Sequence, residues 1–268
     1  MNFYEYLKNK ISGESNKEIV AKLNLFHPIF EKLDEVTFSR WINNKITPSN
    51  KKIALMVLFF EDDYINIISK LKLKPTTKVI SNAINIKKTK LSDPYFSFYD
   101  NIKIHEFNNF QDFPKFHSPK VQKTIDNAVQ ELNSTIKKII LFKGIQTYVY
   151  GIFMHITDSF YFSTLQKTLH KGLYVIMPPT YQTHIQNHRE IIFTTLSYIT
   201  EYLAKNISNI TIILVARTNT FNSYYESLGY KYEKKIFIDK KEYYLYEVML
   251  IDHITSDVMI DIIKDFSR

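Results

Sequence analysis

Polar side chains of the types that read DNA gather in the segment EVTFSRWINNKITPS, residues 35–49. In a helix over about residues 35–43, three apolar side chains share one face: Phe38, Trp41 and Ile42. The side chains that then face outward are Thr37, Ser39, Arg40 and Asn43. Arg pairs bidentately with guanine, Asn with adenine, and Ser or Thr hydroxyls bond bases or phosphates. The pattern therefore predicts a helix whose outer face can enter a DNA groove.

Asn44 follows this helix directly and is expected to end it. After glycine, asparagine is the residue that best tolerates the left-handed backbone conformation found at many helix ends. An ordinary helical bundle, with Trp41 in its core and solvated charges outside, would give the same spacing, so that alternative stays open.

The segment resembles the recognition helix and following turn of the Xre family of phage-repressor-like helix-turn-helix proteins. The likeness lies in Ser-Arg-Trp at residues 39–41, the family's glycine position occupied here by Asn44, then a lysine and shortly Pro-Ser. The resemblance implies double-stranded DNA as the partner, with a second helix crossing the phosphate backbone. The residues that it implies for the DNA backbone are Asn16, Lys17, Lys45 and Lys51. With Asn44 and the four outward side chains, they form the expected DNA-binding set.

Helical spacing recurs throughout the first 70 residues, which predicts several short helices. Ser15 is expected to cap one of them, with Glu18 completing a capping box. Thr47 and Pro48 are expected to open another as its N-cap and first residue, running through Phe60.

Charge supports a polyanion partner for this part of the chain. The chain carries a net charge of +8, and residues 1–90 hold 16 lysines and arginines against 9 acidic residues. Residues 91–268 hold 19 against 18, so the excess lies near the N-terminus. A positive charge of this size can also serve solubility alone, but its localisation favours nucleic acid.

Residues 101–268 are predicted to form a mixed α/β domain. Runs rich in Ile, Val, Tyr and Phe indicate strands over 101–107, 136–142, 146–156, 173–177, 210–216 and 243–250. Helices are expected over 118–132, 188–206 and 219–228. Between the two domains, the basic segment 73–100 is interrupted by Pro75 and Pro94 and is interpreted as a linker.

The segment NTFNSYYESLGY, residues 219–230, follows the buried-strand pattern ITIILVA and precedes the strand EYYLYEVML. This order resembles the closing part of the GNAT family of N-acetyltransferases, in which a strand, a Tyr-bearing helix, a Leu-Gly-aromatic stop and a last strand follow one another. The resemblance implies that Tyr225 can protonate a leaving thiolate. An aromatic residue before Leu-Gly-Tyr is equally useful as core packing.

The same resemblance implies that acetyl-CoA is held by backbone N–H groups of a loop at a helix N-terminus. The corresponding loop here is Gln182 to His188, and its cofactor-binding positions are Gln182, Gln186, Asn187 and His188. Gln186 and His188 stand where the family has small residues, and a β-carbon hinders close approach of backbone to phosphate. We therefore expect a degenerate, acetyltransferase-like domain with no cofactor, and acetyl-CoA only if the domain is active.

Other candidate chemistry in this domain is weaker. His184 and His188 stand at i, i+4 spacing, as metal ligands do, but no Glu follows the first His as a metalloprotease requires. Glu190 and Glu226 are candidate bases that fit solvated helix surface equally well. No metal site is predicted.

Several functions are excluded by composition. The chain has no cysteine, so disulfides and thiolate metal sites are absent. Its longest apolar run, Ile53 to Phe60, is too short to cross a bilayer, and the N-terminus MNFYEYLKNK lacks a secretory signal pattern. These features predict a cytoplasmic protein without a membrane partner.

The predicted architecture is α plus α/β: an all-helical helix-turn-helix domain over 1–72, a basic linker over 73–100, and a GNAT-like α/β domain over 101–268. The leading hypothesis is a DNA-binding transcription regulator whose second domain is a non-catalytic sensor or dimerisation module. A homodimer and a small-molecule or protein effector would be its further partners. The alternatives are an active acetyl-CoA-dependent N-acyltransferase with a DNA-targeting domain, and a protein-interaction adaptor.

Overall fold

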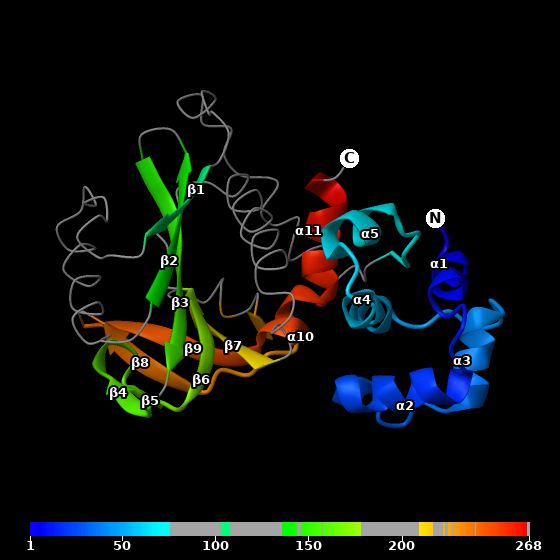
Figure 1. Cartoon of the computed structure of the whole chain (residues 1–268). Helices are drawn as coiled ribbons and strands as arrows, with labels where there is room; N and C mark the ends of the chain where they lie inside the picture. The colour runs from blue at the N-terminus through cyan, green and yellow to red at the C-terminus, as the bar shows by residue number, and fades with distance from the viewer. Residues whose placement is uncertain are drawn as a thin grey trace. The chain divides into compact units, whose positions relative to one another are not determined.

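The computed structural model describes residues 1–75, 103–107, 136–143, 146–156, 158–177, 209–216, 222, 225–226, 228–238 and 240–266. These residues combine helices with two β-sheets (Figure 1). Contacts divide the chain into two compact units. One contains the N-terminal helices and the segment from Ile254 onward, and the other contains the sheets.

The helical unit begins with five α-helices and one 3-10 turn, as the sequence predicted for its first 70 residues. They are α1 (Phe3–Lys10), α2 (Asn16–Phe26), η1 (Pro28–Phe30), α3 (Glu35–Ile42), α4 (Asn50–Phe59) and α5 (Tyr64–Lys70). Side chains from all of these elements are fully buried, among them Leu7, Leu23, Phe30, Phe38, Leu55, Met56 and Ile68. A shared apolar core therefore holds these short helices, which would be marginal in isolation.

Helix caps follow the sequence prediction at α2 and depart from it at α4. The Ser15 side chain accepts the Glu18 N–H, and Glu18 reaches back to the Ser15 N–H, so the capping box is confirmed. At α4 the prediction of Thr47 as the N-cap was wrong by two residues. Ser49 is the N-cap, because its hydroxyl accepts the Lys52 N–H, and Pro48 is buried ahead of the helix.

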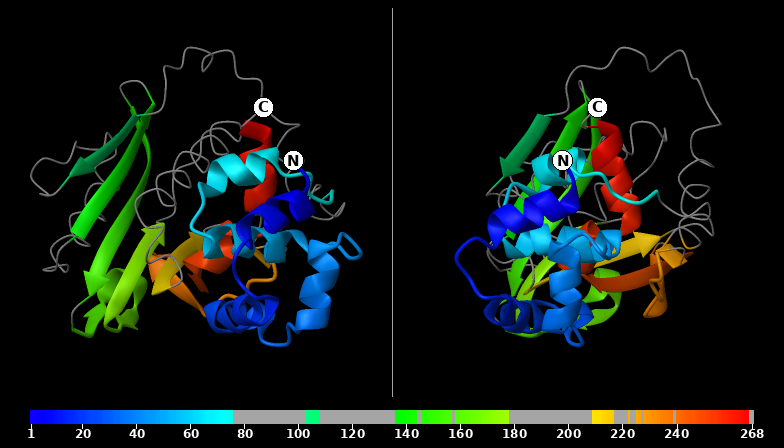
Figure 2. Two further views of the ribbon diagram at one scale, coloured as in Figure 1. Left: turned by 45° about the vertical axis from the view of Figure 1, so that its right-hand side comes forward. Right: turned by 90° about the vertical axis from the view of Figure 1, so that its right-hand side faces the viewer.

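The last helix, α11 (Asp257–Phe266), packs against α4 and α5. Figure 2 shows it beside α5 in both views. The buried Tyr64 hydroxyl donates a 2.8 Å hydrogen bond to the Ile254 carbonyl, and Lys264 Nζ donates to the Leu71 carbonyl at 3.1 Å. Burial raises the pKa of Tyr64, so its hydroxyl keeps the proton that it donates. The segment from Ile254 onward thus groups with the N-terminal helices, whereas the sequence analysis placed it in the α/β domain.

The main sheet has the strand order β1-β2-β3-β6-β7-β9-β8. Its strands are β1 (Lys103–Phe107), β2 (Ile136–Lys143), β3 (Gln146–Ile156), β6 (Gly172–Met177), β7 (Ile210–Ala216), β8 (Lys234–Ile238) and β9 (Lys241–Met249). All described neighbours are antiparallel except β6 and β7, which pair in parallel with Leu173 opposite Ile210. The six strands that the sequence predicted are confirmed, with ends shifted by up to two residues, while β8 was not predicted.

A small second sheet, β4 (Phe160–Phe162) and β5 (Lys167–Leu169), covers part of the main sheet's core. Phe162, Leu165 and Leu169 are buried in one cluster with residues of β6, β7, β8 and β9. The turn between β4 and β5 contains a short 3-10 turn (Ser163–Leu165) and ends at Gln166, whose backbone is left-handed at φ 51°. Apolar burial therefore fixes this hairpin in place.

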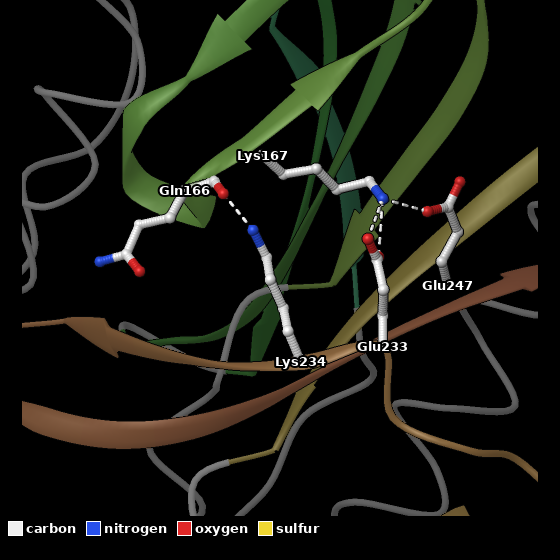
Figure 3. A network of polar contacts seen from close by, with 5 residues as sticks. All are labelled: Gln166, Lys167, Glu233, Lys234 and Glu247. Atoms are coloured by element: carbon white, nitrogen blue, oxygen red, sulfur yellow. Dashed lines mark hydrogen bonds and ion pairs between the residues drawn. The ribbon is translucent and has the colours of Figure 1, made fainter.

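A polar network ties the same hairpin to β8 and β9 (Figure 3). Lys167 Nζ lies 2.6 Å from a Glu233 carboxylate oxygen and 2.5 Å from one of Glu247. Lys234 donates to the Gln166 carbonyl, and the Gln166 side chain donates to the Phe237 carbonyl at 3.1 Å. Burial opposes the charge of Lys167, but the two glutamates outweigh it and raise its pKa. Its ammonium therefore stays charged and joins the β4–β5 hairpin to the β8–β9 hairpin, which is distant from it in sequence.

Among the described helices, none is both long and apolar enough to span a bilayer.

Replacing Tyr64 with Phe should lower the free energy of unfolding of the helical unit by about 1 to 3 kcal/mol, because a buried carbonyl loses its partner. Urea unfolding of the full chain, followed by the fluorescence of Trp41, measures this change, since the chain has a single tryptophan. Tyr4→Phe, which removes an exposed hydroxyl bonded to Glu5, is the matched control and should cost less than about 0.5 kcal/mol. Equal losses in the two variants would contradict a structural role for the Tyr64 bond.

Candidate nucleic-acid interface

The candidate interface is the outer face of α3, whose first turn is set by Asp34. The Asp34 carboxylate caps the helix by accepting the Thr37 N–H at 2.6 Å. That hydrogen bond lowers the pKa of Asp34, so the cap is a carboxylate at neutral pH. An anion is favourable at the positive end of the helix dipole. The start of α3 is therefore fixed by local chemistry.

The inner face of α3 is fixed by two aromatic rings. Phe38 and Trp41 are buried, with their ring centroids 6.1 Å apart in an edge-to-face arrangement. The ammonium of Lys52, on α4, lies 5.7 Å from the centre of the Trp41 ring. The helix also packs against α1 and α2. The predicted inner face is confirmed as buried for Phe38 and Trp41, while its third member, Ile42, is half-buried.

The end of α3 is fixed by a left-handed residue. Asn44 has φ 54°, which confirms its predicted role as the stop. The N–H groups of Lys45 and Ile46 then both point back to the Arg40 carbonyl, at 2.8 and 3.3 Å. Such bonds satisfy a carbonyl that the helix itself leaves unpaired. The backbone of Arg40, on the outer face of α3, thus holds the turn that follows the helix.

The residues predicted to bind DNA fall into two groups by exposure. Those that are exposed are Lys17, Arg40, Asn43, Asn44 and Lys45, and those that are half-buried are Asn16, Thr37, Ser39 and Lys51. The structure brings those from Thr37 to Lys45 together on α3 and its turn, while Asn16 and Lys17 begin α2 and Lys51 lies in the first turn of α4. Their contact with DNA stays a prediction.

Asn43 is held in a defined orientation. Its side-chain amide donates to the Ser39 carbonyl at 2.9 Å and lies 3.3 Å from the Ser39 hydroxyl. The amide nitrogen is thereby turned toward the helix, and the two polar side chains act as one unit. The expected contacts of Ser39 and Asn43 with a DNA groove are therefore coupled.

Sequence reasoning missed Val36, in the first turn of α3. Its side chain is 61% exposed. Only side chains that form hydrogen bonds were expected to contact DNA, so the prediction left out an apolar residue on the outer face. The signal was present in the spacing, because Val36, Arg40 and Asn43 stand at i, i+4 and i+7.

In the sheet unit, the candidate acid Tyr225 lies in an aromatic cluster. Its ring centroid is 4.9 Å from that of Tyr246 and 6.5 Å from that of Tyr230. Burial raises the pKa of Tyr225, with the Tyr246 hydroxyl adding to the effect. A phenol with a raised pKa gives up its proton less readily, so this position favours packing over acid catalysis.

Polar contacts surround this cluster. The Tyr246 hydroxyl donates to the Asn222 side-chain oxygen, and the Asn222 amide donates to Glu226 at 2.9 Å. Glu226, a candidate base, is exposed. Burial lowers the pKa of His253 to about 4, so its ring is neutral at pH 7, and its Nδ1 lies 3.1 Å from the Tyr230 hydroxyl.

The predicted cofactor loop lies outside the described residues. This applies to Gln182, Gln186, Asn187 and His188, and also to His184 and Glu190. Within the part of the chain that the structure describes, no three His, Asp or Glu side chains are grouped so that they could hold a metal ion.

Replacing Asn44 with Ala should lower the free energy of unfolding by about 0.5 to 1 kcal/mol, because alanine adopts the left-handed conformation at greater cost. Asn44→Gly should change stability in the opposite direction, since glycine carries no β-carbon. Urea unfolding followed by Trp41 fluorescence measures both changes, with Lys45→Ala as an exposed neighbouring control. A loss of stability in Asn44→Gly as large as in Asn44→Ala would contradict the conformational explanation.

No family model and no curated protein matches the chain. Among solved structures, an aminoglycoside N(6')acetyltransferase from Legionella pneumophila is 12% identical with a TM-score of 0.31, over 56% of this chain and 93% of that one. Mutant forms of a spermidine/spermine N-acetyltransferase from Vibrio cholerae are 9% identical with a TM-score of 0.30, over 56% and 95%. A chimera of the spermidine N-acetyltransferase from Vibrio cholerae is 10% identical with a TM-score of 0.29, over 56% and 96%.

Proposed function

We propose that the chain binds double-stranded DNA sequence-specifically through the outer face of α3 and acts as a transcription regulator. The observation that carries this proposal is the division of α3 into two faces. Phe38 and Trp41 anchor one face in the core, while Arg40 and Asn43 are exposed on the other. A rigid helix that presents such side chains outward has the form that enters a major groove.

The chemistry of the exposed face fits base edges. The guanidinium of Arg40 has the planar donor fork that matches the O6 and N7 acceptors of guanine. Asn43, held by Ser39, lies on the same face toward the end of the helix. At the start of α2, the exposed Lys17 is suited to a backbone phosphate.

Net charge contributes less to the proposal than the sequence indicated. Residues 1–75 hold 12 lysines and arginines and 9 acidic residues, and residues 254–266 add one lysine and three aspartates. These two ranges together carry a net charge of +1, and the whole unit, which also includes residues 76–81, 196–205 and 267–268, carries +3. The positions of Lys17, Arg40, Lys45 and Lys51 matter more than the total, because phosphates are contacted locally.

The sheet unit serves this function without catalysis, as a sensor or dimerisation module. The packing of Tyr225 among other tyrosines and its raised pKa support this role. The loss of both small residues from the loop at Gln186 and His188 supports it from the sequence. An active N-acyltransferase is the rival function.

Arg40→Ala should weaken binding to the preferred DNA site by about 1 to 3 kcal/mol and relax the preference at one base pair. Sites selected from a random duplex library, followed by fluorescence anisotropy titrations, measure both effects. Arg40→Lys keeps the charge but loses the planar fork, so it should show the same relaxed preference. Lys17→Ala should instead weaken all sequences alike and reduce the salt slope by about one. A wild-type affinity and preference in Arg40→Ala would contradict the assignment of α3.

Titration calorimetry of the full chain with acetyl-CoA tests the role of the sheet unit. We expect no binding at micromolar concentration, because the loop lacks the small residues that close approach to a pyrophosphate needs. Micromolar binding, with thiol release in the presence of an amine acceptor, would support the acyltransferase. Loss of that release in Tyr225→Phe, but not in the control Tyr232→Phe at an exposed tyrosine, would then identify the acid.

A further inference from the structure

Val36 is the exposed apolar residue on the outer face of α3. With 61% of its side chain in contact with solvent, it adds little to the core of the helical unit. Valine is also less favourable than alanine on a helix surface, because its branched β-carbon restricts the side chain. The fold therefore gains less from valine at this position than it would from a buried valine.

The position of Val36 relative to its neighbours is set by helix geometry. Val36, Arg40 and Asn43 form one ridge, opposite the face on which Phe38 and Trp41 are buried. All three ridge residues are exposed. Val36 precedes Arg40 by four residues, which is about 6 Å along the helix axis. That length is a little under two base-pair steps of B-DNA, at about 3.4 Å each.

The ridge thus begins with an apolar side chain, Val36, and continues with two polar ones, Arg40 and Asn43. An aliphatic side chain gains free energy in a groove only where it covers another apolar group. In the major groove, the apolar group that a base pair presents is the C5-methyl of thymine. When a helix-turn-helix protein binds DNA, the residues at the N-terminal end of its recognition helix contact the base edges. Val36 lies at that end of α3.

We propose that Val36 contacts the C5-methyl group of a thymine that lies one or two base pairs from the base contacted by Arg40. This inference rests on the DNA binding proposed above and adds a specificity-determining residue to it. The contact contributes through burial of two apolar groups, so it distinguishes thymine from uracil, which lacks only the methyl.

A deoxyuridine scan of the selected DNA site tests the contact. Each thymine in turn is replaced by deoxyuridine, and binding of the full-length wild-type protein is measured by fluorescence anisotropy. One position near the Arg40-dependent base should lose affinity roughly fourfold, the equivalent of about 0.8 kcal/mol for one buried methyl group at 1.36 kcal/mol per tenfold. The other thymines should tolerate the exchange.

Variants at Val36 assign the effect to this side chain. Val36→Ala should bind the thymine site about as weakly as wild type binds the uracil site, and should no longer distinguish the two bases at that position. Val36→Thr keeps one methyl and the branched shape, so it should retain part of the discrimination. Leu25→Ala is the matched control, because it removes a 90% exposed apolar side chain from α2 and should leave the uracil penalty unchanged.

The outcomes separate this inference from the proposed function. Sequence-specific binding with no uracil-sensitive position, or a uracil penalty that persists unchanged in Val36→Ala, would overturn the contact and leave DNA recognition standing. A protein that selects no DNA sequence would overturn both. Far-UV circular dichroism of Val36→Ala should match wild type, since the side chain is exposed, and it excludes unfolding as the cause of a lost preference.

Discussion

The helical unit depends on one buried hydrogen bond and the packing around it. The Tyr64 hydroxyl on α5 reaches the Ile254 carbonyl, 190 residues later, and α11 then packs against α4 and α5. The helices α1 to α5 and α11 have seven to eleven residues and are marginal alone, so each relies on the apolar side chains that its neighbours supply. Because α4 provides Lys52 beside the Trp41 ring, the support of α4 by α11 also bears on the inner face of α3.

The two units are joined by more covalent connections than the sequence predicted. The sequence predicted a single linker between the two domains, over residues 73–100. Near the end of the chain there is a further connection, because β9 ends at Met249 and α10 (Leu250–Ile254) follows at once, leading to α11. The buried residues Leu250, Ile251 and Ile254 lie on this connection. The chain thus passes from the last strand of the sheet unit to the last helix of the helical unit through α10.

Patterns within short segments predicted many of the strands and helices. Contacts between segments that are distant in sequence could not be predicted in this way. Six strands followed from runs of Ile, Val, Tyr and Phe, the end of α3 followed from Asn44, and its buried face followed from the spacing of Phe38 and Trp41. Helix α11 was not predicted, and its partner could not have been, because periodicity shows that a helix has an apolar face but not which core covers it. Strands β4 and β5 have three residues each, too few for a pattern.

The modest net charge of the helical unit bears on the kind of recognition that the proposed contact of α3 with DNA would use. A strongly basic domain gains most of its affinity from phosphates, which bind all sequences alike. Here α11 contributes Asp257, Asp261 and Asp265 against a single lysine, so this unspecific term is limited. For the proposed DNA binding, we therefore expect a larger share of the binding free energy to come from contacts with base edges. Under that proposal, the apolar residue, the guanidinium and the oriented amide on one ridge would make three chemically different contacts of that kind.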